Sequence, residues 1–203
     1  MCKRMLAVYF VLILGAFSMS GCASTKVERV DVDEQIDLSG DWNDYDAMLV
    51  SQEMIKDCLS RPWIHDFVKK EGSDPVVIVG NIRNRTNEHI NSQVFVKYLE
   101  RELLNSGKVT FVASAIERGG IRDEREDQAK GFTDPDTMAE IGKEHGADYM
   151  LIGTVNSVID QVKRKSVNYY QVNLELVDMS TNKKVWIGQK EIKKYVQKPR
   201  MSL

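Results

Sequence analysis

The last third of the chain alternates between hydrophobic and polar positions with the two-residue period of a β-strand. Residues 149–159 alternate in this way, and so do residues 170–176. A third run starts at Val185 and Ile187, after the turn-forming residues 178–182. The pattern predicts three long strands joined by tight connections, which form an antiparallel meander.

The first half of the chain combines helical spacing with one continuous hydrophobic run. One helix is predicted from apolar residues at helical spacing, namely Ala47, Val50, Met54 and Cys58. A second helix, which ends at Gly107, is predicted from the stripe Val94, Phe95, Tyr98, Leu99 and Leu103. Between them, residues 75–82 form an unbroken apolar run, which is typical of a strand buried on both faces. Residues 109–112 predict a short further strand.

Three polar segments complete the predicted order of elements. Residues 83–88 predict a polar loop, and the charge-dense residues 117–130 predict either an exposed helix or a mobile loop. Asp134 and Pro135 supply a cap and a first-turn proline for a helix that ends at residues 145–146. Together the elements predict an α+β fold: a single domain whose mixed sheet includes a C-terminal antiparallel three-strand meander, with helices packed mainly on one face.

The N-terminal residues have the three parts of a secretory signal. Lys3 and Arg4 form a basic region, residues 5–17 form a short apolar region, and residues 18–21 form a small-residue cleavage site before Cys22. The apolar stretch is shorter than the roughly 20 residues that span a bilayer as a helix. An ordinary cleaved signal followed by a chance cysteine, or an uncleaved anchor, remain the alternatives.

The cleavage site also resembles the bacterial lipobox, in which the cysteine receives lipid chains. This resemblance predicts a lipoprotein signal peptide over residues 1–21 and an acylated Cys22. Residues 22–37 then form a short disordered tether, which reaches about 50 Å at full stretch. We expect the folded domain over residues 38–198 and a tail over residues 199–203.

Charge is distributed unevenly along the chain. Residues 22–159 hold 16 basic and 26 acidic side chains, whereas residues 160–203 hold 10 basic and 4 acidic ones. The C-terminal excess includes residues 163–165 and 183–184, which lie near the predicted turns of the meander. Either this is the solvated face of a hairpin, or it is a basic patch that steers an acidic partner or meets an anionic surface.

The sequence lacks the motifs of common catalytic and metal centres. No metal-ligand spacing includes any of the three histidines, His65, His89 and His145. Cys58 sits in a helical stripe and is predicted to be a buried thiol, and Trp42 and Trp63 are predicted to pack their rings against the domain. We therefore expect a protein that is not an enzyme and has no metal, no cofactor and no nucleic-acid partner.

Four segments resemble the LpoB family of penicillin-binding protein activators. They are residues 37–50, 58–63, 77–86 and 146–153, and the resemblance extends over residues 37–195. The last segment also recurs in the amino-terminal domain of TolB and in the CsgG secretion lipoproteins. The resemblance implies a TolB N-terminal-like fold and an outer-membrane lipoprotein that activates a class A penicillin-binding protein in peptidoglycan synthesis.

Two functions therefore follow as expectations. The first is a lipid-anchored domain, monomeric and facing the periplasm, that binds and activates a class A synthase. The alternative is a CsgG- or TolB-like component of an envelope secretion or structural assembly, which would act by oligomerisation. For the first function, arginines in the polar segments are the candidate partner-binding residues, because arginine is enriched at binding hot spots. These candidates are Arg83, Arg85, Arg118 and Arg122.

Overall fold

The computed structural model describes residues 27–139, 141–142 and 144–199. The chain divides into two units, Met1–Glu34 and Gln35–Leu203, and every helix and strand named below lies in the second. The predicted signal peptide and Cys22 lie outside the described residues. No helix in the part of the chain that the structure describes is long and apolar enough to span a bilayer.

The second unit is built on a five-stranded mixed sheet in the order β2-β1-β3-β4-β5. The strands are β1 (Val76–Arg85), β2 (Thr110–Phe111), β3 (Tyr149–Val162), β4 (Lys165–Asp178) and β5 (Lys184–Gln197). Strand β1 is parallel to both β2 and β3, while β3, β4 and β5 are antiparallel neighbours. The predicted three-strand meander is confirmed, and its strands are longer than the alternating segments from which they were predicted.

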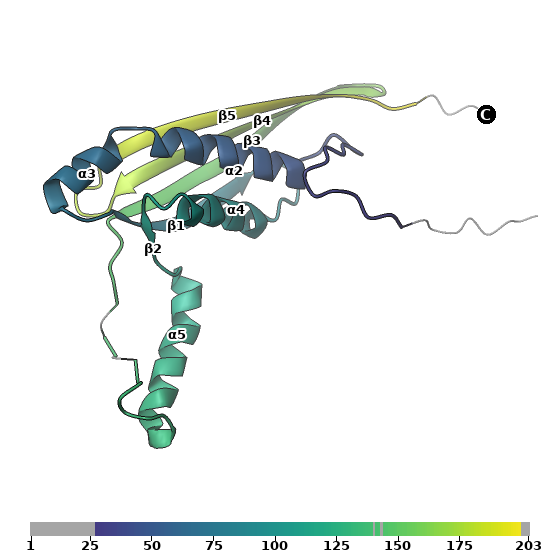
Figure 1. The fold of residues 1–203 in the computed structure, drawn as a ribbon. Coiled ribbons are helices and arrows are strands. Elements are labelled where there is room, and N and C mark those ends of the chain that lie inside the picture. Colours follow the sequence, from purple (N-terminus) through teal and green to yellow (C-terminus); the bar gives the residue numbers. More distant parts are fainter. Residues whose placement is uncertain (1–26, 140, 143, 200–203) are drawn as a thin grey trace, which may run out of the picture. The chain divides into compact units, whose positions relative to one another are not determined.

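Two helices cover one face of this sheet, as predicted (Figure 1). Helices α2 (Asp44–Leu59) and α4 (Ser92–Asn105) pack against each other and over the strands, and α3 (Trp63–Glu71) follows α2 after Pro62. Helix α5 (Ala115–Asp127), followed by the short π-helical segment η1 (Gln128–Phe132), leaves the edge of the sheet and extends away from it (Figure 1). Of the two alternatives for residues 117–130, the structure thus has the helix.

The core lies between the sheet and the two covering helices. Val50 and Cys58 of α2, Leu99 of α4, and Leu151 and Leu174 of the sheet are completely buried. Burial removes apolar surface from water, which is the dominant favourable contribution to folding. The predicted buried thiol is confirmed, and burial raises the pKa of Cys58 to about 12.

The geometry of the α2–α3 junction is set by one tryptophan. The Trp63 indole N–H donates to the backbone oxygen of Cys58 at 2.8 Å, and its ring meets the ring of Tyr149 edge-on at 5.0 Å. A buried indole needs such a hydrogen-bond partner for its N–H group. The packing predicted for this tryptophan is therefore confirmed.

Trp42 packs against the domain at the other end of α2. Its ring contacts Phe95 and Tyr170 edge-on, with centroid distances of 6.0 and 5.7 Å. The Trp42 backbone N–H donates to a carboxylate oxygen of Glu88 at 3.0 Å, and the other oxygen of Glu88 accepts from the Tyr170 hydroxyl. Glu88 thereby joins the segment before α2 to the loop before α4 and to β4.

Three local predictions need correction. The helix predicted from Asp134 to residues 145–146 is wrong, because the described residues of that stretch form turns and irregular chain. Ile141 in this stretch is 63% exposed, so its side chain does not stabilise a helix by packing. Arg83 and Arg85 lie in β1 rather than in a loop, because β3 is long enough to pair with them. Val94 is exposed and lies outside the buried stripe of α4.

Candidate interaction surfaces

Arg83 and Arg85 lie near the C-terminal end of β1, where the strand is an edge of the sheet. Strand β2 pairs only with Val76 and Val77, so from Ile78 onward β1 is paired only with β3. Both arginines are exposed, and neither forms an ion pair with another residue that the structure describes. Charged side chains on an edge discourage indiscriminate strand pairing and leave two guanidinium groups open to a partner.

Arg118 and Arg122 lie on α5, and the structure already gives one of them a partner. Arg122 donates two parallel hydrogen bonds of 2.8 Å to the carboxylate of Glu144, and Arg125 adds a contact of 3.4 Å. The bond from Arg122 holds the pKa of Glu144 below its usual value. Arg118 is half-buried, and its Nε has no hydrogen-bond partner among the described residues.

The four candidate arginines therefore form two pairs on different elements, not one cluster. Helix α5 begins beside β1, because its N-terminal residues Ala115 and Ile116 line a shallow hollow of about 350 Å³ with residues 79–82 of that strand. The start of α5 is fixed by Ser114, whose side chain accepts from the Glu117 backbone while Glu117 accepts from the backbone of Ser114. A protein partner that used all four arginines would have to span this junction.

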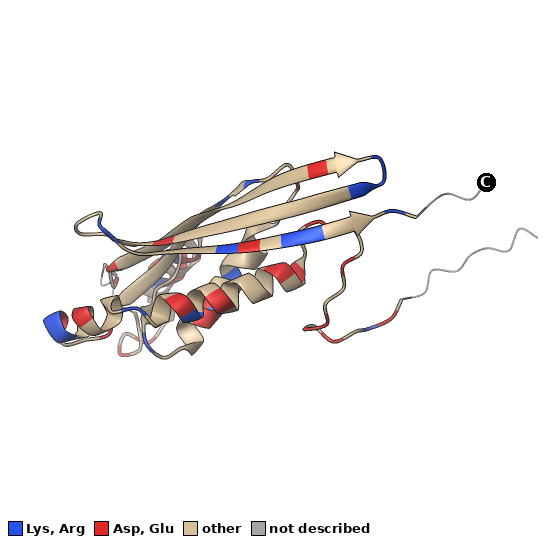
Figure 2. Cartoon of the chain, turned by 90° about the horizontal axis from the view of Figure 1, so that it is seen from above, with Lys and Arg blue, Asp and Glu red and all other residues tan. Residues whose placement is uncertain are grey.

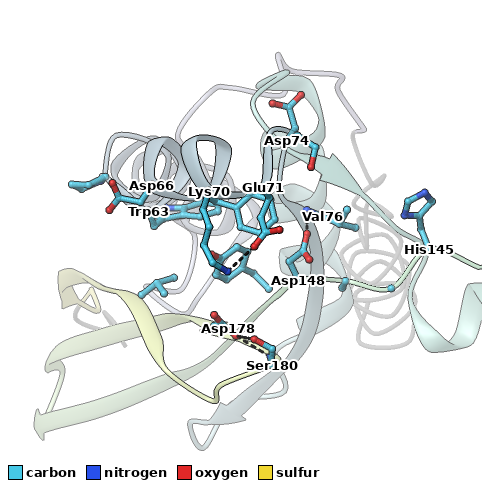
Figure 3. Close-up of a pocket in the computed structure, with 17 residues that line it drawn as sticks. Trp63, Asp66, Lys70, Glu71, Asp74, Val76, His145, Asp148, Asp178 and Ser180 are labelled. Atoms are coloured by element: carbon cyan, nitrogen blue, oxygen red, sulfur yellow. Dashed lines mark hydrogen bonds and ion pairs between the residues drawn. The ribbon is translucent and has the colours of Figure 1, made fainter.

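A larger hollow, of about 890 Å³, lies at the α3 end of the sheet (Figure 3). Trp63, Phe67 and Tyr149 supply aromatic walls, and several carboxylates surround them. Two of these carboxylates hold the backbone in place: Asp148 accepts from the Val76 N–H at 2.8 Å, and Asp178 accepts from the residues of the following turn.

The rest of this hollow offers no assembled chemical centre. Lys70 pairs with its neighbour Glu71, and His145 lies at the rim, apart from the carboxylates (Figure 3). Within the described ranges, no group of three or more His, Cys, Asp or Glu side chains is placed to hold a metal ion. The side chains of this hollow mainly support the strand ends and turns that they contact.

An ion-pair cluster that the sequence analysis missed fastens the start of the second unit. Lys194 of β5 contacts Asp37 and Asp46, each at 2.6 Å, and is almost buried between them. Desolvation opposes the charge on Lys194, but hydrogen bonds to the two carboxylates outweigh it and raise the pKa of the lysine. Burial raises the pKa of Asp46, which also caps α2 through the backbone of Asn43.

No local signal identifies this cluster, because Lys194 lies 157 residues after Asp37 in the sequence. In the alternating pattern of β5, Lys194 looks like any lysine of a solvated strand. The contact arises because the inward-facing lysines of β5 meet acidic residues on and before α2, as Lys190 also does with Glu53.

Comparison with known proteins gives one family match and several similar structures. The family model described as peptidoglycan-synthase activator LpoB matches residues 46–192. The chain is similar to the LpoB C-terminal domain from Salmonella enterica, with 19% identity over 64% of this chain and 93% of that chain and a TM-score of 0.36. It is also similar to LpoB from Escherichia coli, with 18% identity over 89% of this chain and 85% of that chain and a TM-score of 0.40.

A further similar structure is a lipoprotein from Neisseria meningitidis, with 17% identity over 63% of this chain and 88% of that chain and a TM-score of 0.39. No curated protein sequence matches the chain significantly. The family model covers more than half of the chain, from within α2 to within β5. The chain therefore belongs to the LpoB family of peptidoglycan-synthase activators.

Proposed function

We propose that this protein is an outer-membrane lipoprotein that binds a class A penicillin-binding protein and stimulates its peptidoglycan synthesis. Membership of the LpoB family is the observation that carries the proposal. The protein acts by contact and not by catalysis. If it binds the active conformation of the synthase more tightly than the inactive one, this difference in affinity shifts the synthase toward the active conformation. Such an activator needs a rigid contact surface and no reactive group.

The anchor of this proposal is Cys22. Removal of residues 1–21 exposes this cysteine for acylation, and three lipid chains hold a protein on a membrane far more firmly than the marginal binding of one chain. Ala23 and Ser24 after the cysteine favour the outer membrane in enteric bacteria. Labelled palmitate should enter the wild type but not Cys22→Ala, and equal incorporation in both would refute the anchor.

The tether sets how far the domain reaches. From Cys22 to Gln35, where the folded unit begins, 13 residues span at most about 45 Å. The 14-residue strands β3 to β5 make the domain itself about 45–50 Å long. The contact surface therefore lies within roughly 100 Å of the lipid anchor, and the synthase must extend to meet it.

The contact surface that we propose includes the four arginines, with Arg83 and Arg85 as its centre. Arg83 and Arg85 are exposed and unpaired within the described structure, and they stand on a rigid strand. Arg118 and Arg122 lie on α5, which begins beside the same strand, and Arg122 must exchange Glu144 for a carboxylate of the partner. Its contribution is smaller for that reason.

The test measures glycan polymerisation by the class A synthase of the same organism with the acylated full chain. Wild type should stimulate, and Arg83→Glu/Arg85→Glu should weaken synthase binding by about tenfold or more. The control Lys69→Glu/Lys183→Glu changes the net charge equally at exposed lysines on α3 and the β4–β5 turn. Failure of wild type to bind or stimulate would refute the activator function, whereas stimulation that survives the arginine reversal refutes only this placement.

A further inference from the structure

The end of the β3–β4 hairpin projects beyond the two covering helices. Buried residues of β3 stop at Val155, and the strand continues for seven more residues to Val162. Val162 is 67% exposed and Tyr195, on the neighbouring end of β5, is 61% exposed. We call residues 158–165 together with residues 195–198 the hairpin end. It is an exposed strip of sheet whose apolar side chains do not belong to the hydrophobic core.

The hairpin end carries a concentrated positive charge (Figure 2). Its cations are Lys163, Arg164, Lys165 and Lys198. They surround a hollow of about 730 Å³ with Val162, Gln197 and Pro199. None of the four forms an ion pair with another described residue, and Asp160 is the single carboxylate of the hairpin end.

Lys163, at the tip of the hairpin, has a backbone conformation that lysine rarely adopts. Val162 pairs with Lys165, so the hairpin closes through the two residues Lys163 and Arg164. Lys163 has a φ of 54°, in the left-handed region where glycine and asparagine are the usual choices. Lysine is less favourable than glycine or asparagine in this conformation, and the turn itself does not require a lysine. Locally unfavourable residues of this kind concentrate at functional sites.

The start of the folded unit is fastened close to this hairpin end. Asp37 pairs with Lys194, which lies opposite Asn168, while Lys165 lies opposite Gln197. Lys194 therefore directly precedes Tyr195 of the hairpin end and lies three strand residues, about 10 Å, from Gln197. Gly40 reinforces the attachment: its oxygen accepts from Asn168 at 2.9 Å, and a Cβ on it would collide with Val196.

This arrangement fixes where a lipid on Cys22 would hold the domain. The segment from Cys22 to Gln35, 13 residue steps long, has a relaxed end-to-end distance of about 20 Å. The chain thus enters the folded unit at the end that carries the free cations, within a short tether length of the acyl chains. Confinement of this kind gives a weak surface contact a high effective concentration.

We propose that the hairpin end docks on the surface of a bilayer that contains anionic phospholipid. Lys163, Arg164, Lys165 and Lys198 meet the headgroup phosphates, while Val162 and Tyr195 enter the interfacial layer. Basic residues near an anionic surface each strengthen binding, and a tyrosine places its ring and hydroxyl at the level of the headgroups. The inference rests on the proposed lipid anchor, which supplies the confinement.

The contact would orient an anchored domain that otherwise only diffuses at the end of its tether. With the hairpin end on the bilayer, the β4–β5 turn and α3 point away from the membrane, because they lie at the other end of the same strands. Salt at high concentration would release the contact, since the Debye length falls from about 8 Å at physiological ionic strength to about 3 Å at 1 M.

The test uses the acylated full chain in vesicles of phosphatidylcholine, with or without phosphatidylglycerol. A polarity-sensitive fluorophore is attached through Val162→Cys at the hairpin end, or through Met179→Cys at the exposed β4–β5 turn as a control. Cys58 stays unlabelled because it is completely buried. The label at 162 should be shielded from an aqueous quencher only with phosphatidylglycerol and only at low salt, and the label at 179 should stay accessible throughout.

Charge reversal separates specific docking from net charge. Lys163→Glu/Arg164→Glu/Lys165→Glu should reduce the shielded fraction by roughly tenfold or more. The matched variant Lys69→Glu/Lys108→Glu/Lys183→Glu changes the charge equally at exposed lysines without ion pairs to described residues, and should dock as wild type does. Shielding that is equal in both lipids, or that survives the hairpin reversal, overturns the proposal. Shielding that appears only after the synthase is added also overturns it and assigns the hairpin end to a protein partner.

Failure of the anchor remains distinguishable from failure of the docking. Intact mass spectrometry of the same preparation shows whether Cys22 carries lipid before any vesicle is added. A chain without lipid refutes the anchor, and flotation of that chain with phosphatidylglycerol vesicles still decides the docking. Salt-sensitive flotation that the hairpin reversal abolishes supports docking, and its absence in wild type refutes it.

Discussion

The hydrogen bond between Glu88 and Tyr170 can be tested directly by a double-mutant cycle. One oxygen of the Glu88 carboxylate accepts from the Trp42 backbone N–H at 3.0 Å, and the other accepts from the Tyr170 hydroxyl. Tyr170 is completely buried, so its hydroxyl depends on Glu88, and not on water, for a hydrogen-bond acceptor. We expect Tyr170→Phe to destabilise the wild type but to have almost no effect in Glu88→Ala.

The expected magnitude follows from the charge on the acceptor. A hydrogen bond to a charged group contributes about 1.5–3 kcal/mol net, against about 1 kcal/mol for a neutral pair. Tyr170→Phe should therefore lower the free energy of unfolding by about 2 kcal/mol. Glu88→Ala should cost more, about 3 kcal/mol, because it leaves both the hydroxyl and the Trp42 N–H without their acceptor. The predicted coupling free energy between the two residues is about 1.5–2 kcal/mol.

Urea unfolding of the wild type, both single variants and the double variant measures this coupling. The slopes of the unfolding free energy against urea should agree among the four proteins, so that differences in midpoint report stability alone. Glu88→Gln serves as the matched control, because its amide oxygen can still accept from the Trp42 N–H. If the two single costs add to within about 0.5 kcal/mol in the double variant, Glu88 does not hold Tyr170 and the reasoning fails.

Three further predictions test packing and charge elsewhere. Trp42→Ala should lower the free energy of unfolding by about 3 kcal/mol, because the ring packs edge-on against two aromatic side chains; a melting temperature close to wild type would assign the ring to binding instead. Gly153→Ala should destabilise by about 1–3 kcal/mol, since its Cβ would collide with the backbone oxygen of Asn173, and calorimetry should show the loss. Lys97 holds the pKa of Glu117 near 2, below its ordinary 4.5. The stabilisation that ionised Glu117 gives to α5 is therefore complete above pH 4.5 and disappears as the pH falls toward 2. Amide exchange in α5 should follow that loss, and Glu117→Gln should remove the Glu117 contribution to the pH dependence while leaving that of the Arg122–Glu144 pair.

The sheet was predictable because its C-terminal strands carry a two-residue period over most of their length. Strands β3 and β4 alternate buried and partly exposed positions along their shared register, which is the pattern that the sequence shows. The same logic failed for Arg83 and Arg85, because their pairing depends on the length of β3 and not on their own side chains. A polar strand end and a polar loop have the same composition, and only the partner strand distinguishes them.

The two charged segments show why start signals alone do not define a helix. Ser114 and Glu117 form a capping box, and the helix that follows has the additional contact between Glu117 and Lys97 of α4. Asp134 and Pro135 also offer a start signal, yet the described residues after them up to Gly146 form no helix. A short helix in water needs tertiary contacts to persist, and the exposed Ile141 supplies none.

The candidate surfaces were less predictable than the fold because they depend on contacts between distant parts of the chain. Whether an arginine is available to a partner is decided by its neighbours: Glu144 occupies Arg122, while Arg83 and Arg85 have no such carboxylate within the described structure. The basic residues of the β3–β4 turn were visible in the sequence. Their position beside the entry of the N-terminal segment depends on Asp37 and Lys194, which only the folded chain brings together.

The proposed bilayer contact and the proposed synthase contact are geometrically compatible on one domain. Arg85 lies opposite Asn156, which is six residues from Val162, so about 20 Å of strand separates Arg85 from the tip of the hairpin. With the hairpin end on the membrane, the edge of β1 would stand above the lipid headgroups and remain open to a protein that approaches from the periplasm. A short tether and a docked hairpin would then present the arginine edge in a restricted range of orientations. Restricting the free domain in this way lowers the entropy that binding must overcome, which favours the synthase complex without any added contact.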